Sequence, residues 1–302
     1  MHFGSISRYV GMLCIFPVLA HTPVLADTDL DDSQTPHGAS VPGSADMAEA
    51  PPDVLLPSAD AQKTTSGLAT KVLKIGVGSD HPADNDCVSI VFRAWRRDGT
   101  LVSTSGHGDE ASTQCVRPAM PGIAEALKLM VVGEKRRIWL PADLTHVAVV
   151  HHAHKQLMDS ETSKMDLTFD LELVRILRAP PTPSDLRSPA KGALRMPSGV
   201  YMQILKPGVG RSHPSVTSWL TVDYTGWTSD GKLFESTALV DHPRLVLFGM
   251  TLPGWQETLQ NMVVGEMVRL WVPAALAYGD NPEDMLLPKG DLIYDLQLLA
   301  FN

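Results

Sequence analysis

The strongest constraint on the fold is an internal repeat, in which residues 66–146 align with residues 198–278 at a constant offset of 132 and without a gap. In this alignment 28 of the 81 pairs are identical, a register that chance does not preserve over such a length. The segment Met130–Glu134, for example, returns unchanged as Met262–Glu266. A repeat unit of about 105 to 115 residues has the size of a domain rather than of a solenoid repeat. We therefore expect two copies of one globular module, each with its own core.

The charge of the chain limits its partners. The net charge is -9 at pH 7, and Lys and Arg form no cluster along the sequence. We expect no nucleic-acid partner, because affinity for a phosphate backbone comes from clustered cationic side chains.

The first 26 residues have the features of a secretory signal peptide. They contain one charged residue, Arg8, an apolar stretch from Gly11 to Ala20, and the small-residue sequence Val24–Ala26 before Asp27. The apolar stretch is too short to span a membrane. We expect cleavage near Ala26 and an exported protein, periplasmic or secreted, with no membrane contact beyond the signal peptide; the alternative is an uncleaved anchor.

Two segments of biased composition flank the first copy of the repeat. Residues 27–63 are rich in Asp, Ala, Pro and Ser and nearly free of large apolar side chains. Such a segment cannot bury enough surface to offset the entropy of ordering, so we expect a disordered tether. Residues 179–197 contain five prolines, which favour an extended, semi-rigid linker. With these two segments set apart, the two modules are expected at residues 64–178 and 198–302.

Hydrophobic periodicity in the second module is mostly that of strands. Val200–Lys206 and Trp219–Thr228 alternate and are rich in β-branched and aromatic residues, and the turn sequence Ser229–Lys232 follows. One helix is predicted, opened by Pro253 and ended by Gly265, with apolar residues between them at helical spacing. Further strands are predicted at Leu233–Glu235, Leu245–Phe248, Arg269–Val272 and Leu292–Leu299.

Several motifs of the second module, in their order and spacing, resemble the FKBP-type peptidyl-prolyl cis-trans isomerases. They are Asp223–Gly226, Asp230–Ser236, Pro253–Trp255, Met262–Glu266, Val272–Pro273, Leu276–Gly279 and Tyr294–Leu299. The resemblance covers residues 198–302. It implies an α+β fold in which a curved antiparallel sheet wraps around one short helix, with a shallow apolar pocket between them.

The resemblance also implies an activity, prolyl isomerisation, that needs no cofactor. The partners it implies are proline-containing peptides, unfolded exported proteins and tacrolimus-type macrolides. The alternative is a non-catalytic peptide-binding chaperone or scaffold built on the same fold.

Seven pocket positions carry over from the family to this sequence. They are Tyr224, Phe234, Glu235, Leu252, Trp255, Tyr278 and Tyr294. By resemblance, Trp255 forms the floor, and Tyr224 and Phe234 form aromatic walls. The hydroxyl of Tyr278 and the backbone N–H of Leu252 would hydrogen-bond a ligand. Glu235 stands where the family usually has Asp, Tyr294 where it usually has Phe, and Arg244 where an aromatic residue is common.

The first module keeps the framework of this pattern and loses the pocket. At the same offset, pocket residues are replaced by Phe92, Val102, Ser103, Ile123 and His146, while Gly99, Gly122, Gly133 and Pro141 persist. We therefore expect an FKBP-like domain without isomerase activity, which docks or holds substrate.

Two further groups of residues leave alternatives open. The histidines His146, His151, His152 and His154 have a spacing that can ligate zinc or nickel, but exposed histidines that bind nothing are the alternative, and we assign no metal. Cys87 and Cys115 align with neighbouring strands of the family fold, which predicts a disulfide. The alternative is two separate buried thiols, if the strand register differs by one residue.

Overall fold

The computed structural model describes residues 49–106, 110–145, 165–284 and 287–302. The predicted signal peptide, residues 27–48 of the predicted tether and the four clustered histidines lie outside these residues. Within the described ranges, no helix has the length and apolar character that crossing a membrane requires.

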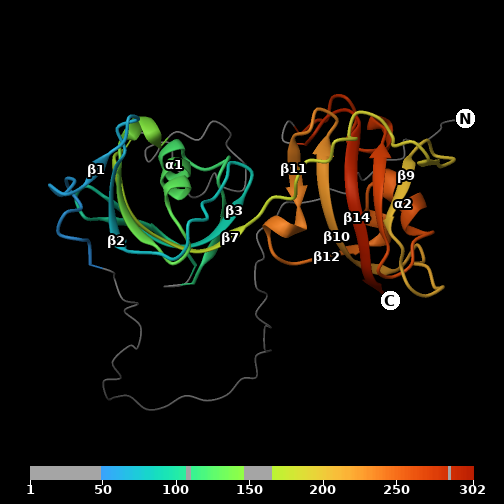
Figure 1. Cartoon of the computed structure of the whole chain (residues 1–302), viewed down its shortest axis with the longest axis horizontal. Coiled ribbons are helices and arrows are strands. Elements are labelled where there is room, and N and C mark those ends of the chain that lie inside the picture. The colour runs from blue at the N-terminus through green and yellow to red at the C-terminus, as the bar shows by residue number, and fades with distance from the viewer. Residues whose placement is uncertain (1–48, 107–109, 146–164, 285–286) are drawn as a thin grey trace, which may run out of the picture.

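The first module is a seven-stranded antiparallel sheet around one helix (Figure 1). The strand order is β1-β2-β6-β7-β3-β4, and β5 pairs with β3. Its elements are β1 (Gln62–Lys63), β2 (Ala69–Lys74), β3 (Cys87–Arg96), β4 (Leu101–Thr104), β5 (Ser112–Cys115), α1 (Pro121–Leu129), β6 (Lys135–Leu140), the 3-10 helix η1 (Ala142–Leu144) and β7 (Leu167–Leu177).

The second module repeats this topology, with strand order β11-β10-β14-β13-β9-β8 and β12 paired with β10. Its strands are β8 (Leu194–Arg195), β9 (Tyr201–Lys206), β10 (Trp219–Thr228), β11 (Leu233–Ser236), β12 (Arg244–Leu247), β13 (Met267–Val272) and β14 (Leu292–Phe301). Its helices are α2 (Pro253–Leu259) and the 3-10 helices η4 (Thr237–Leu239), η5 (Phe248–Met250) and η6 (Ala274–Leu276). The predicted α+β class and the two-module repeat are confirmed.

The helix of the second module packs closely against its sheet because of a glycine at its start. A Cβ at Gly254 would lie 2.3 Å from Cγ1 of Val272 on β13, so no larger residue fits without a shift of the helix. The helix is shorter than predicted: α2 ends at Leu259 and not near Gly265. The chain continues as a turn, in which the N–H of Met262 donates to the carbonyl oxygen of Thr258 at 3.1 Å.

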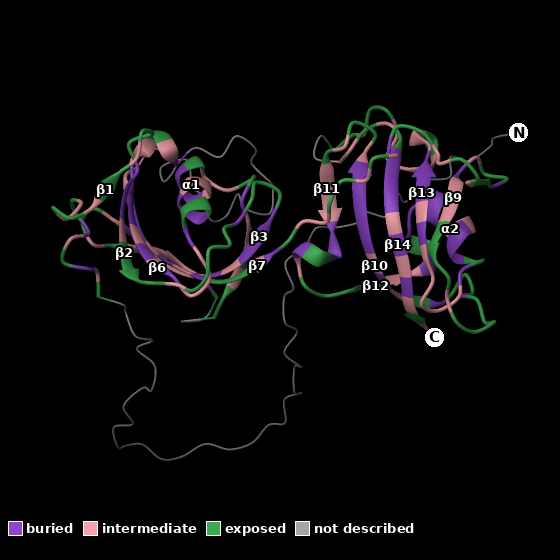
Figure 2. Cartoon of the chain, viewed as in Figure 1, coloured by how far each residue is buried: buried purple, intermediate pink, exposed green. Residues whose placement is uncertain are grey.

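Each module has its own hydrophobic core between the sheet and the helix, as the buried inner faces in Figure 2 show. In the second module this core contains Leu220, Leu259, Leu270 and Leu296, which are fully buried. The corresponding core of the first module contains Val88, Leu127, Ile138 and Leu171.

The prediction of a disordered tether is wrong for residues 49–63. Asp53 forms an ion pair with Arg137 of β6, and its carbonyl oxygen accepts a hydrogen bond of 2.7 Å from Nε1 of Trp139. The carbonyl oxygen of Val54 accepts a second bond, of 2.8 Å, from the Thr168 hydroxyl on β7. This segment therefore lies along the outer face of the first sheet and ends in β1.

The predicted linker makes the same contacts with the second sheet. Asp185 lies 2.5 Å from Arg269 of β13, and its carbonyl oxygen accepts a hydrogen bond of 3.1 Å from Nε1 of Trp271. Leu186 is buried beside it. Asp185 and Leu186 stand 132 positions after Asp53 and Val54, so the repeat extends upstream of the aligned region. Residues 179–197 are thus a structural part of the second module as well as a connection.

The predicted disulfide is present. Cys87 of β3 and Cys115 of β5 face each other in the antiparallel register and are joined. The pairing confirms the register on which the prediction depended.

Candidate active site

Three strands and one helix bring the predicted pocket residues of the second module together. In the sheet register, Gly226 of β10 pairs with Glu235 of β11 on one side and with Tyr294 of β14 on the other. Tyr224 lies two residues earlier on β10, on the same face as Gly226 because side chains alternate along a strand. Trp255, in the first turn of α2, lies against this face.

The aromatic side chains pack edge to face in a continuous cluster. The Trp255 ring centroid lies 5.0 Å from that of Tyr224 and 5.0 Å from that of Tyr294, with interplanar angles of 72° and 88°. Phe234 continues the cluster at 5.7 Å from Tyr294. Edge-to-face pairs at this spacing are favourable, since the ring edges and faces carry opposite partial charge. The rings therefore hold one another in place without a ligand.

Gly226, the last residue of the Asp223–Gly226 motif, makes this cluster possible, a role that was not predicted. A Cβ at Gly226 would lie 2.6 Å from Cζ of Phe234 and 2.9 Å from Cε1 of Tyr294, closer than real carbon contacts. The strand thus carries glycine where the two rings cross it. The sequence signal was present: a glycine inside a β-strand often marks such a close approach.

Two predicted ligand-binding groups lie beside the cluster. Leu252 directly precedes α2, and its backbone N–H has no acceptor among the described residues. Tyr278 follows η6 and is partly buried against the same core. Burial raises the pKa of Tyr278 to about 12, which keeps its hydroxyl a neutral hydrogen-bond donor.

The polar side of the site is formed by Glu235. The Tyr224 hydroxyl donates a hydrogen bond to its carboxylate, and an Arg244 nitrogen lies 3.8 Å from the same oxygen. Burial raises the pKa of Glu235, against the opposing effects of Tyr224 and Arg244. Burial, followed by the Glu235 charge, also raises the pKa of Tyr224. A carboxylate and a neutral tyrosine thus share one short polar contact at the edge of an apolar site.

Trp255, the predicted floor of the site, has a buried indole donor. Trp255 is 3% exposed, and its Nε1–H has no hydrogen-bond partner among the described residues. Buried donors are nearly always paired, so an unpaired one is unusual. The site thus combines packed aromatic rings with two backbone or side-chain donors, the Leu252 N–H and the Trp255 Nε1–H, that have no partner among the described residues.

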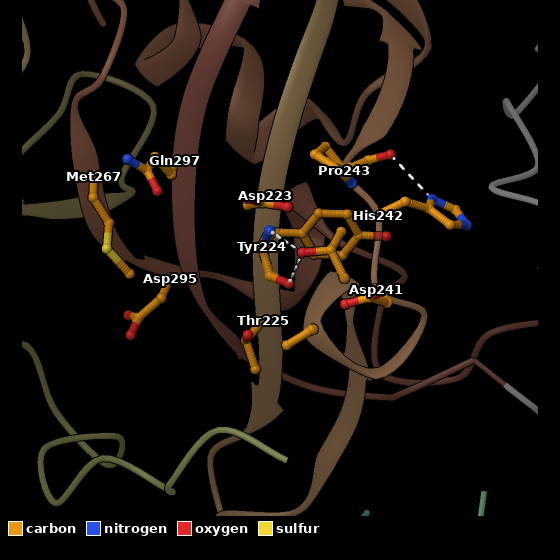
Figure 3. Close-up of a pocket in the computed structure, with 11 residues that line it drawn as sticks. Asp223, Tyr224, Thr225, Asp241, His242, Pro243, Met267, Asp295 and Gln297 are labelled. Carbon is orange, nitrogen blue, oxygen red and sulfur yellow. Dashed lines mark hydrogen bonds between the residues drawn. The ribbon is translucent and has the colours of Figure 1, made fainter. Parts of the chain in front are cut away.

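A separate pocket lies near this site but opens on other residues (Figure 3). Its volume is about 350 Å³, and of the seven candidate residues only Tyr224 lines it. In Figure 3, Met267, Asp295 and Gln297 lie on one side of β10, and Asp241 and His242 lie on the other. The rings of the cluster are largely buried, with Tyr224 4%, Trp255 3% and Tyr294 1% exposed, and of these three only Tyr224 lines this pocket.

Comparison with known proteins agrees with the fold and with the motifs. The model of the family described as FKBP-type peptidyl-prolyl cis-trans isomerase matches residues 78–174 and residues 210–299. The chain belongs to this family. Both modules of this FKBP-family chain are matched, including the one without the aromatic cluster.

Relatives share about one module with this FKBP-family chain. FkpA of Aeromonas hydrophila is 32% identical over 112 residues, which are 37% of this chain and 41% of FkpA. The outer membrane protein MIP of Legionella longbeachae is 34% identical over 110 residues, 36% of this chain and 47% of MIP. FK506-binding protein 1 of Candida glabrata is 33% identical over 107 residues, 34% of this chain and 94% of that protein. The chain thus spans less than half of the FkpA and MIP relatives.

Solved structures of the family are similar in part. The crystal structure of FkpA from Escherichia coli is 29% identical, with a TM-score of 0.35, over 37% of this chain and 53% of that chain. The structure of the three FKBP domains of wheat FKBP73 is 22% identical, with a TM-score of 0.34, over 79% of this chain and 96% of that chain.

The first FKBP-like module has a different interior at the position of the cluster. Phe92 and Phe169 remain, with ring centroids 6.2 Å apart, but Ile123 stands at the position of the indole and Val102 at that of the phenyl wall. At the position of Gly226 stands Ala94, which is buried. His146, the counterpart of Tyr278, lies outside the described residues. The first module therefore keeps two phenyl rings here but has aliphatic side chains in place of the indole and of the phenyl wall.

Proposed function

We propose that this protein is a peptidyl-prolyl cis-trans isomerase that assists the folding of exported proteins, with its activity in the second module. The observation that carries the proposal is the edge-to-face cluster of Tyr224, Trp255, Tyr294 and Phe234 beside the N–H of Leu252, which has no acceptor among the described residues. The seven residues predicted by resemblance are the proposed site.

The chemistry needs no covalent step. Resonance in the C–N bond gives a rotation barrier of about 18 to 20 kcal/mol, and X-Pro bonds are those that populate both isomers. The amide loses this resonance and becomes less polar as it twists. An apolar site that holds the proline ring over Trp255 favours the twisted amide over the planar one, which is preferential binding of the transition state. The Leu252 N–H and the Tyr278 hydroxyl would fix the neighbouring carbonyl groups.

The proposed partners and location follow from the same proposal. Proline-containing segments of unfolded exported proteins are the substrates, and tacrolimus-type macrolides would compete for the aromatic cluster. Export is supported by the signal-like sequence of residues 1–26 and by the name of one relative, an outer membrane protein. We assign the first module a non-catalytic role, because its Ile123 and Val102 provide no aromatic floor or wall.

The experiment is an NMR exchange assay on an X-Pro peptide with the full chain and three variants. Trp255→Ala removes the proposed floor; because truncating a buried aromatic residue also costs about 3 to 5 kcal/mol of folding stability, the fold of the variant is verified first. We expect it to lose most of the activity, and Tyr278→Phe to lose less because one hydrogen bond goes. Lys74→Ala, which removes an exposed ion pair with Glu172 in the first module, is the control and should leave the rate unchanged. A folded Trp255→Ala protein with wild-type activity would refute the proposal.

A further inference from the structure

The two modules contact each other at the border of the proposed site. Residues 237–243, here called the rim loop, join β11 to β12 and so connect Glu235 to Arg244. Leu239 of this loop is 8% exposed and packs with Cys87 and Leu177 of the first module. Figure 1 shows the β11 side of the second sheet turned toward the β3 and β7 ends of the first. The first module thus covers the apolar side chain of the rim loop.

An ion pair accompanies this apolar contact. Asp241 of the rim loop lies 2.6 Å from Arg175 of β7. Asp241 has φ 61°, and among the described residues it is the one non-glycine residue in this left-handed region. A strained backbone conformation of this kind persists only where the surroundings hold it. Here a contact from the other module contributes to holding it.

Hydrogen bonds connect the rim loop to the site. The N–H of Asp241 donates to the carbonyl oxygen of Thr237 at 3.0 Å. The Thr237 hydroxyl accepts from the N–H of Tyr224 at 3.1 Å and lies 3.3 Å from the Tyr224 carbonyl oxygen. Tyr224 in turn donates from its hydroxyl to Glu235. The backbone of this wall residue is therefore tied to the rim loop, and its hydroxyl is tied to Glu235 on β11, the strand that leads into the loop.

We propose that the first module is an intramolecular positioning element for the isomerase site, acting through Leu239 and Arg175 on the rim loop and thereby on Tyr224 and Glu235. This inference rests on the proposed function of the second module. It gives the first module a role that does not depend on a pocket. The disulfide between Cys87 and Cys115 joins β3 to β5, and both cysteines belong to the apolar cluster that contains Leu239. The disulfide therefore fixes the surface against which Leu239 packs.

The apolar contact should carry more of this effect than the ion pair. The side chains of Arg175 and Asp241 are 54% and 52% exposed, and ion pairs so exposed to water contribute little. Leu239, by contrast, is removed from water. Replacing Leu239 should therefore disturb the site more than replacing Arg175.

The test compares full-length variants in the X-Pro exchange assay, with kcat and KM measured separately. Leu239→Ser should lower kcat/KM by about 2- to 30-fold, the range expected for a coupling contact, and mainly through KM because Tyr224 is a binding wall. Leu239→Met, which keeps the apolar contact, should retain wild-type values. Lys74→Ala, which removes an exposed 3.0 Å ion pair with Glu172 inside the first sheet, is the matched control and should have no effect.

A double-mutant cycle separates this positioning role from a purely local one. Leu177→Ser removes the partner of Leu239 from the first module, so the double variant Leu177→Ser/Leu239→Ser should be no slower than Leu239→Ser alone. If Leu239→Ser does not fold, Arg175→Glu places a repelling charge beside Asp241 and should raise KM in its place. Additive effects in the cycle, or wild-type kinetics for the folded variants, would overturn the inference while the proposed function stands. An inactive wild-type chain would refute the proposed function itself.

Discussion

The most specific consequence of the structure concerns Gly226, where strand β10 passes beneath two aromatic rings. A Cβ at this position would meet Phe234 at 2.6 Å and Tyr294 at 2.9 Å, against an ordinary contact of about 3.5 to 4.0 Å. The Phe234 ring must therefore move by about an ångström, or the strand must shift. Overpacking of this kind costs about 1 to 3 kcal/mol. We expect Gly226→Ala to lower the free energy of unfolding by that amount.

The same substitution should reduce catalysis, because a displaced Phe234 would no longer form the proposed wall for the proline ring. A loss of about 1.4 kcal/mol in transition-state binding corresponds to a tenfold fall in kcat/KM. Urea unfolding and the X-Pro exchange assay measure the two effects on one sample. The first module indicates which second substitution would relieve the clash. It carries Ala94 at the position of Gly226 and Val102 at the position of Phe234.

The double variant Gly226→Ala/Phe234→Val reproduces that pair in the second module. It should recover much of the stability, because the phenyl ring that clashes is gone, but not the activity, because the wall is gone as well. Ala94→Gly in the first module is the control and should leave kcat/KM unchanged. Wild-type stability and wild-type kcat/KM for Gly226→Ala would refute the reasoning about this close approach.

Three further predictions concern the charge, the disulfide and the ligand. Because burial raises the pKa of Glu235 above its ordinary value of 4.5, its ionisation destabilises the fold as pH rises through the folded-state pKa. Glu235→Gln should therefore gain stability relative to wild type in urea unfolding at pH 7, and the gain should vanish below about pH 4; an equal gain at both pH values would exclude this cause. Thiol counting on denatured, unreduced mature protein should find no free thiol, and Cys87→Ser/Cys115→Ser should lose about 3 kcal/mol of stability; two free thiols would contradict the bridge. Calorimetry with a tacrolimus-type macrolide should give one binding site per chain, which Trp255→Ala removes; two sites would mean that the first module also binds.

Much of the fold follows from local sequence signals. The repeat predicts two modules, and the alternation of Trp219–Thr228 and the apolar spacing after Pro253 predict the central strand and the helix. The register that opposes Cys87 and Cys115 was predicted because the strands align with neighbours in a known fold. Resemblance, rather than periodicity, predicted the seven site residues, since an aromatic residue in a strand is more often core than site.

The segments before each module were not predicted, for a physical reason. Residues 49–63 contain three prolines and belong to a segment rich in Asp, Ala, Pro and Ser, and composition averages over the few groups that anchor them, chiefly Asp53 on Arg137 and Val54 on the sheet. Those anchors are visible only as an extension of the repeat, in which Asp53 and Asp185 share the offset of 132. The contact between Leu239 and the first module joins residues distant in sequence and has no local signal.

The central claim is that one module of this FKBP-family chain isomerises prolyl bonds and the other does not. The direct measurement is the X-Pro exchange rate of residues 179–302 and of residues 49–178, prepared separately so that each keeps its core and its preceding segment. We expect acceleration by residues 179–302 and the uncatalysed rate with residues 49–178. Acceleration by residues 49–178, or none by residues 179–302 in a folded state, would contradict the account.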